Sequence, residues 1–187
     1  MVAQRGGAGG AAEAGNDAKP AAAVQPAARN EALVRQAQVK ARARMRQDAR
    51  KHSSEEIGSA EELYQVANKN WRTEQARQSL QQMVEKFPDV NRTGCAVLYL
   101  GQMSVGEERE RLLTDAMEKY GDCYYGNGVN VGAYARFLLA HYYKENGEAD
   151  KAKKLFNEIR TKYADAIDHG GRSLVAQLQA AEAGNGE

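Results

Sequence analysis

The stretch from Tyr134 to Asp165, YARFLLAHYYKENGEADKAKKLFNEIRTKYAD, constrains the fold more than any other part of the chain. Its apolar residues recur three and four positions apart on both sides of Asn146-Gly147, a spacing that places them on one face of a helix. The Asn-Gly pair itself is a turn signal. The stretch therefore predicts two antiparallel helices, which need neighbouring elements to bury their remaining apolar surface.

This predicted hairpin resembles the tetratricopeptide repeat, a helix–turn–helix unit of about 34 residues with an L-G…Y…A…F…P pattern. Counted from Gly147, the pattern positions are occupied by Leu139, Ala140, Tyr143, Ala152, Phe156 and, in place of proline, Ala164. The spacing from Ala152 to Ala164 recurs from Ala76 to Pro88. Residues 59–88 therefore form a second copy of the repeat.

Residues 96–120 form a degenerate third copy between these two. All three copies end in an aromatic residue, a small residue and an aspartate: Phe87-Pro88-Asp89, Tyr120-Gly121-Asp122 and Tyr163-Ala164-Asp165. A last helix over 172–182 would cover the open end of the array, as repeat proteins require. The predicted fold class is all-α: a tetratricopeptide-like α-solenoid of about three helical hairpins with a C-terminal capping helix.

Four segments are expected along the chain. Residues 1–30 contain eleven Ala and five Gly but no Leu, Ile or aromatic residue, so they cannot bury enough apolar surface to become ordered and predict a disordered tail. Residues 31–58 predict a basic helix and linker, 59–182 the repeat domain, and 183–187 a disordered end. The domain is expected to start at Ser59 because Ser59 and Glu62 match a helix capping box.

The basic helix over 31–51 carries seven Lys or Arg residues against Glu31 and Asp48. Its apolar stripe is thin, and consists of Val34, Ala37, Ala41 and Met45. Two interpretations stay open at this point. The helix is a solvated connector, or it docks on an anionic membrane, a nucleic acid or a protein partner. It lacks the aromatic residues that would stack on bases, and no specific nucleic-acid partner is predicted.

The segment Cys123–Gly132 is an insertion, because the last two repeat endings lie ten residues further apart than the first two. Gly126-Asn127-Gly128 at its centre is a turn signal. The segment does not match the Gly-rich pattern of a phosphate-binding loop. Its role stays open between a rigid loop, which packs Tyr124 and Tyr125 over the junction of two repeats, and a ligand contact.

The resemblance to tetratricopeptide repeats implies that a protein or peptide binds in a concave groove lined by the first helix of each repeat. Matched by offset, the groove positions are Glu61, Gln65, Asn68 and Lys69 in the first copy, and Tyr134, Phe137, His141, Lys144 and Glu145 in the last. Family members that clamp the C-terminal carboxylate of a chaperone need Lys and Asn in the first repeat. Glu61 and Gln65 stand there instead, which argues against that class of partner.

The run from Tyr120 to Leu174 also resembles uncharacterised bacterial tetratricopeptide proteins with a Gly-Asp/Asn-Gly-Val loop before a repeat and an Asp-His-Gly turn after it. Many of these are exported, which implies a periplasmic or secreted protein whose signal peptide is absent from this chain. A cytoplasmic protein is the alternative. No run of eighteen apolar residues is present, so no transmembrane segment is expected.

Cys95 and Cys123 fall at neighbouring ends of the degenerate hairpin, where a disulfide is geometrically allowed. A bridge and two free thiols stay equally open, and the bridge would need an oxidising compartment. The two cysteines lack the paired spacing of a metal site, and His52, His141 and His169 are far apart in the sequence.

The best catalytic combination in the sequence is Cys123 with His169 and either Asp168 or Asp165, and it rests only on their positions near repeat ends. We therefore predict no catalytic residue, no metal and no cofactor. The leading hypothesis is a non-catalytic scaffold that binds a protein or peptide. The alternatives are an envelope-associated structural component attached through the basic helix, and a thiol-active or enzyme-accessory protein.

Overall fold

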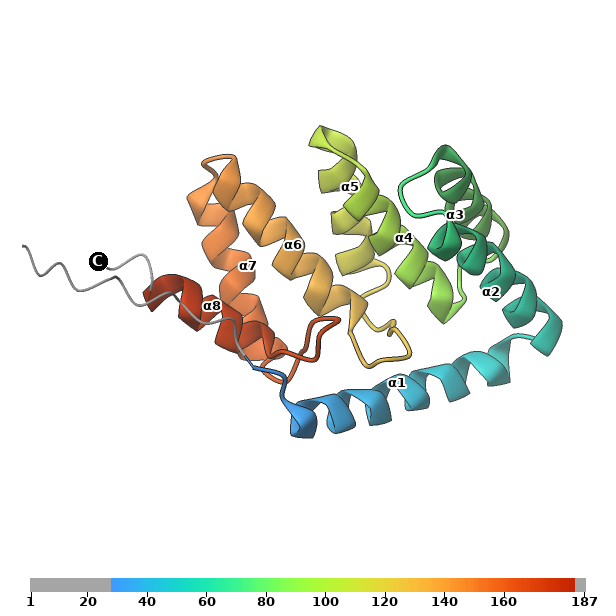
Figure 1. Cartoon of the computed structure of the whole chain (residues 1–187), viewed down its shortest axis with the longest axis horizontal. Helices are drawn as coiled ribbons and strands as arrows, with labels where there is room; N and C mark the ends of the chain where they lie inside the picture. The colour runs from blue at the N-terminus through green and yellow to red at the C-terminus, as the bar shows by residue number, and fades with distance from the viewer. Residues whose placement is uncertain (1–27, 184–187) are drawn as a thin grey trace, which may run out of the picture.

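The computed structural model describes residues 28–183. Within this range the chain forms eight α-helices and no β-strand (Figure 1). The helices are α1 (Glu31–Lys51), α2 (Ser54–Lys69), α3 (Glu74–Lys86), α4 (Asn91–Met103), α5 (Gly106–Glu118), α6 (Val131–Glu145), α7 (Ala149–Lys162) and α8 (Leu174–Ala183). Of the tail predicted over 1–30, residues 1–27 lie outside the described residues. Of the disordered end predicted over 183–187, residues 184–187 lie outside them as well.

Three antiparallel hairpins stand side by side: α2 with α3, α4 with α5, and α6 with α7 (Figure 1). The helix α8 packs on α7 at the end of the row. The chain is therefore an all-α, tetratricopeptide-like helical repeat array, as the sequence predicted. None of the helices in residues 28–183 combines the length and the apolar composition that crossing a bilayer requires.

One continuous apolar core runs along the row of hairpins. Leu80, Leu98, Leu113 and Leu139, one from each of four different helices, are at most 2% exposed. A smaller cluster, which includes Ile159 and Leu174, lies beneath α8. This second cluster explains why the array needs its last helix, because α7 would otherwise expose these side chains to water.

The helix start predicted at Ser59 differs from the one in the structure. Ser59 and Glu62 lie inside α2, and the capping box is formed by Ser53 and Glu56. The hydroxyl of Ser53 accepts the backbone N–H of Glu56 at 3.1 Å, and the Glu56 carboxylate accepts the N–H of Ser53 at 2.8 Å. Both pairs satisfy the Ser-x-x-Glu pattern, but the upstream pair follows an extended residue, His52, where α1 ends. The predicted start was therefore too late.

The helix α3 is capped by Thr73, whose hydroxyl accepts the N–H of Ala76. The first helix of the degenerate repeat, by contrast, starts earlier than predicted, at Asn91 instead of Ala96. Nearly all of α4 is buried, because this helix lies in the middle of the row. Its small residues allow close packing: a Cβ on Gly94 would lie 2.6 Å from the Cβ of Cys123.

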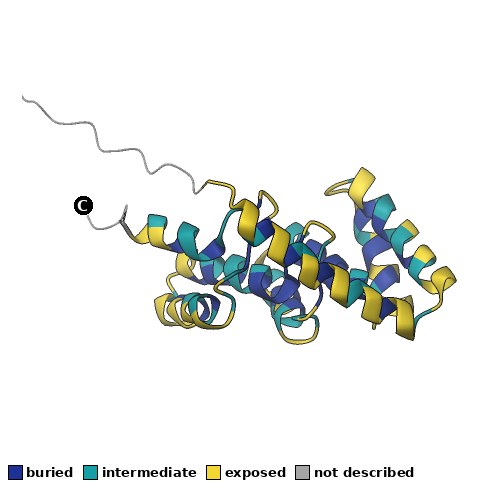
Figure 2. Ribbon diagram, turned by 90° about the horizontal axis from the view of Figure 1, so that it is seen from below, coloured by how far each residue is buried: buried dark blue, intermediate teal, exposed yellow. Residues whose placement is uncertain are grey.

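The helix α1 has the predicted bounds, 31–51, and lies across the ends of the hairpins (Figures 1 and 2). Its inner side chains Val34, Ala37 and Ala41 are at most 6% exposed, and Gly128 of the inserted loop packs directly on Ala37. The solvated-connector interpretation is therefore wrong for the inner half of α1. The outer half faces solvent along its whole length (Figure 2).

Candidate functional site

Two helices and three connecting segments form a shallow pocket of about 210 Å³. The helices are α2 and α4, and the connecting segments are the α2–α3 turn, the inserted loop and the turn before α8. Its lining combines four aromatic side chains, one histidine and two amides: Tyr64, Asn68, Trp71, Tyr99, Gln102, Tyr125 and His169. The indole of Trp71 stacks on the ring of Tyr99 with centroids 4.2 Å apart, and Tyr99 lies 5.9 Å from Tyr64. Trp71 is nevertheless 42% exposed, so part of a large aromatic surface remains available to a ligand.

Ring contacts continue this pocket along α6. The imidazole of His169 lies 4.6 Å from the ring of Tyr125 and 5.1 Å from that of Tyr134. Tyr134 stacks with Phe137 at 6.2 Å, and Phe137 meets His141 at 4.5 Å. We call the pocket residues together with Tyr134, Phe137 and His141 the aromatic groove.

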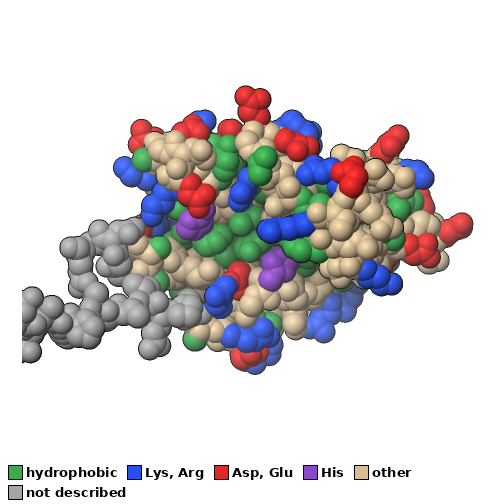
Figure 3. Space-filling view, turned by 45° about the horizontal axis from the view of Figure 1, so that its top comes forward, with side chains coloured by type: hydrophobic (Ala, Val, Ile, Leu, Met, Phe, Trp, Pro, Cys, Tyr) green, Lys and Arg blue, Asp and Glu red, His purple; other side chains and the backbone are tan. Residues whose placement is uncertain are grey.

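Figure 3 shows one face of the molecule on which apolar side chains form a band in a hollow. Two histidines lie beside this band, and charged side chains surround it.

Local structure explains how the aromatic groove is assembled. Tyr134, Phe137 and His141 are spaced by three and four residues on α6, so their side chains share one face of the helix. Trp71 is presented by the tight turn between α2 and α3. In that turn Arg72 adopts a left-handed backbone conformation with φ of 62°, and its guanidinium lies 5.3 Å from the centroid of the Trp71 ring.

The surroundings of the two groove imidazoles favour their neutral forms. Burial disfavours their protonated forms and lowers the pKa of both His141 and His169 below the ordinary value. The hydroxyl of Tyr125 donates to the carbonyl of Cys95 at 3.1 Å, so it is satisfied within the protein. At one end of the groove the guanidinium of Arg92 lies 4.6 Å over the ring of Tyr64 and pairs with Glu61 at 2.6 Å.

The structure brings together four of the nine predicted groove residues. Asn68 lines the pocket, and Tyr134, Phe137 and His141 form the series of rings. The other five are placed differently.

Glu61 lies in a neighbouring pocket beside α1, where Gln65 donates to its carboxylate at 2.6 Å. Lys69, Lys144 and Glu145 are exposed at the ends of α2 and α6, and none of them forms an ion pair within residues 28–183. In particular, the pair between His141 and Glu145 that their spacing allows is absent from this part of the chain.

Offset matching missed Tyr99, Gln102, Tyr125 and His169. It assigned no groove position to the middle repeat because that copy is degenerate. Trp71, which stacks on Tyr99 in this pocket, was not among the predicted groove positions either. The one sequence signal for the loop contribution was the ten-residue insertion, which places Tyr125 in the groove and Asn127 within 3.4 Å of the His169 imidazole.

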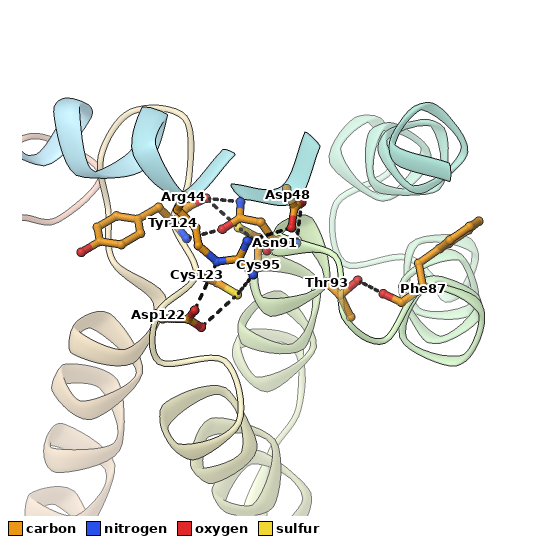
Figure 4. A network of polar contacts seen from close by, with 9 residues as sticks. All are labelled: Arg44, Asp48, Phe87, Asn91, Thr93, Cys95, Asp122, Cys123 and Tyr124. Carbon is orange, nitrogen blue, oxygen red and sulfur yellow. Dashed lines mark hydrogen bonds and ion pairs between the residues drawn. The ribbon is translucent and has the colours of Figure 1, made fainter. Parts of the chain in front are cut away.

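The catalytic combination considered from the sequence is not assembled. The Sγ of Cys123 has Arg44 and Asp122 as its polar neighbours (Figure 4). Asp168 pairs with Arg172 at 2.6 Å, and His169 is held among aromatic rings. Among the described residues, no group of three or more His, Cys, Asp or Glu side chains could hold a metal ion.

Both cysteines are free thiols in the structure. Cys95 is completely buried and Cys123 is 2% exposed. Burial raises the pKa of each thiol to about 12, although Arg92 beside Cys95 and Arg44 beside Cys123 act in the opposite direction. The nucleophilic thiolate is therefore strongly disfavoured at both positions.

One comparison with known proteins found a match. A family model of the tetratricopeptide repeat matches residues 134–166, which cover the hairpin α6–α7. Neither the search of curated proteins nor that of solved structures found a match. The family match and the helical array together support a tetratricopeptide-like protein. The resemblance to exported bacterial proteins stays a prediction.

Proposed function

We propose that this tetratricopeptide-like array is a non-catalytic scaffold that holds a segment of another protein in the aromatic groove. The observation that carries the proposal is a pair of ring series that meet at the pocket. One runs from Trp71 through Tyr99 to Tyr64. The other starts at Tyr125 and His169 in the pocket and continues along α6 to His141. Repeats of this type generally serve as protein-binding modules, and exposed Trp and Tyr side chains dominate the energetics of many protein interfaces.

The chemistry of the groove favours a segment with bulky apolar or aromatic side chains. The floor of the groove consists of rings, and burial favours the neutral forms of its two histidines. The side-chain amides of Asn68 and Gln102 line the same pocket and can hydrogen-bond the backbone of an extended segment. A few such polar groups within an apolar pocket are typical of specific binding sites.

Selection of a random-peptide library on the full chain would test the proposal. The groove variant carries Trp71→Ala and Gln102→Ala, and the matched control carries Val105→Ala, which truncates an 81% exposed apolar side chain outside the groove. Since loss of a hot-spot side chain typically costs at least about 2 kcal/mol, enriched peptides should bind the groove variant roughly 30-fold more weakly. They should bind the control as tightly as the wild type.

Two results would count against this function. One is a selection that enriches no peptide sequence at all. The other is a set of enriched peptides that binds wild type and groove variant equally while both remain folded. Circular dichroism of the three proteins establishes that the comparison is between folded chains.

The thiol-active alternative receives no comparable support. It requires an accessible thiolate, whereas both thiols are buried and their pKa is raised to about 12. The groove contains no cysteine side chain.

A further inference from the structure

The helix α1 separates its cationic residues into two groups. On the inner face, Lys40 pairs with Asp165, and Arg44 pairs with Asp48 at 2.7 Å. On the outer face, the exposed cations form no ion pair within residues 28–183. Four of these cations, Arg35, Arg42, Arg46 and Arg50, form what we call the basic ridge. The seventh cation of α1, Lys51 at its end, is also exposed but does not share their spacing. The inner cations are thus paired with carboxylates of α1 and of the array, and the cations of the basic ridge are not.

The basic ridge is straight. Its arginines, with Val39 between the first two, are separated by three or four residues and therefore lie on one line along the helix. From Arg35 to Arg50 this line is about 22 Å long. The two acidic residues of α1 do not interrupt it, because Glu31 at the start of the helix pairs with Arg29 and Asp48 is buried.

The rest of the molecule has the opposite net charge. The helix α1 contains seven Lys or Arg residues against two Asp or Glu, whereas residues 52–183 contain sixteen against twenty. A protein with such a charge asymmetry is oriented by an anionic surface, with its positive edge toward that surface.

We propose that the basic ridge docks the protein on the headgroups of an anionic lipid bilayer. A flat, negatively charged surface can contact a straight row of arginines along its full length. Val39 is 62% exposed in the middle of the row, so its side chain and the aliphatic stems of the arginines can enter the interfacial region. The aromatic groove lies on the first helices and is not part of this surface.

A nucleic acid fits the same ridge less well. The basic ridge contains no aromatic side chain for stacking on unpaired bases. The inner half of α1 is covered by the hairpin ends along its length (Figure 2), so the helix cannot sink deeply into the major groove of a duplex, whose width is about 12 Å. An anionic lipid surface is therefore the proposed ligand of the basic ridge, and the test includes nucleic acid as the competing ligand.

The test is co-sedimentation of the full chain with vesicles of phosphatidylcholine, alone or mixed with phosphatidylserine, at low and high salt. The ridge variant is Arg42→Gln with Arg46→Gln. The charge-matched control is Lys153→Gln with Lys154→Gln, two exposed lysines of α7. Neither pair of residues forms an ion pair within the described residues, so both variants should keep the thermal stability of the wild type.

The wild type should bind the mixed vesicles at low salt, dissociate from them at high salt and not bind vesicles of pure phosphatidylcholine. Each basic residue near an anionic membrane contributes about fivefold to the partition coefficient, so the ridge variant should bind roughly 25-fold more weakly and the control unchanged. Equal binding by ridge variant and control would overturn the proposal. So would tighter, ridge-dependent binding to duplex DNA or RNA, which would assign the ridge to a nucleic acid. Peptide binding in the aromatic groove should be the same for all these variants. Failure of the lipid proposal is therefore distinguishable from failure of the peptide-binding proposal.

Discussion

The carboxylate of Asp48 on α1 accepts the backbone N–H of Asn91, the first residue of α4, at 2.8 Å (Figure 4). The same carboxylate accepts from the guanidinium of Arg44 at 2.7 Å. The side chain of Asn91 in turn bonds the backbone N–H and the carbonyl of Tyr124, both at 2.8 Å. One buried network therefore joins α1, the start of the middle repeat and the inserted loop, and its anion lies at the positive end of a helix dipole.

Replacing Asp48 by alanine should destabilise the fold strongly. It would leave the N–H of Asn91 without an acceptor and the buried Arg44 with the exposed Asp122 as its remaining ion pair. Removing one partner of a buried ion pair costs about 3 kcal/mol or more, which urea denaturation followed by circular dichroism would measure. The control Glu31→Ala breaks an exposed pair with Arg29 and should cost less than about 1 kcal/mol. Equal effects of the two substitutions would show that the network contributes little.

Two glycine-to-alanine substitutions should change stability in opposite directions. A Cβ on Gly132 would lie 2.7 Å from the Cα of Gly121 and 2.8 Å from its carbonyl oxygen. Because backbone atoms cannot move aside easily, Gly132→Ala should destabilise by about 1–3 kcal/mol. A Cβ on Gly58 in α2 would have no neighbouring atom within 4 Å, so Gly58→Ala should stabilise by about 0.5–1 kcal/mol. Thermal unfolding of both variants checks the two signs.

The sequence was sufficient to predict the hairpins and the bounds of α1, because these depend on local apolar spacing and helix propensity. It was not sufficient to place α1 against the array. That position depends on pairs such as Lys40 with Asp165 and Asp48 with Asn91, whose partners are far apart in the chain. The start of α2 was misassigned because two nearby stretches, 53–56 and 59–62, satisfy the same capping pattern, and only the path of the preceding chain decides between them.

Four of the ten residues of the aromatic groove could be predicted from the sequence. Asn68, Tyr134, Phe137 and His141 follow from repeat offsets, which hold wherever the repeat pattern is intact. Tyr99 could not be found in this way, because the middle repeat has lost the pattern. The positions of Tyr125 and His169 depend on how an inserted loop and the turn before α8 fold back on the first helices, and no repeat offset describes either segment.

Neither cysteine should react with a thiol reagent such as dithionitrobenzoate in the folded protein. Both side chains are buried and their pKa is raised to about 12, so almost no thiolate is exposed at neutral pH. Two thiols per chain should react once the protein is unfolded in urea without a reducing agent. If no thiol reacts even in urea, while two react after reduction, the cysteines form a disulfide and are not free thiols. That result would support a protein of an oxidising compartment.

The two groove histidines should make the fold less stable as the pH falls below neutral. Burial is the main cause that lowers the pKa of His141 and His169 in the folded state, so around the ordinary value of about 6.5 the unfolded chain binds more protons than the folded chain. The stability that depends on these neutral imidazoles is therefore fully present above the pKa that the histidines have in the unfolded chain. It is lost as the pH falls through their lowered pKa in the folded protein. Urea denaturation at about pH 7.5 and about pH 5.5 should show this decrease, and the variant with His141→Gln and His169→Gln should show a smaller one. His52→Gln, which changes the histidine at the junction of α1 and α2, controls for loss of an imidazole outside the groove. A decrease of the same size in wild type and double variant would mean that other groups cause the pH dependence.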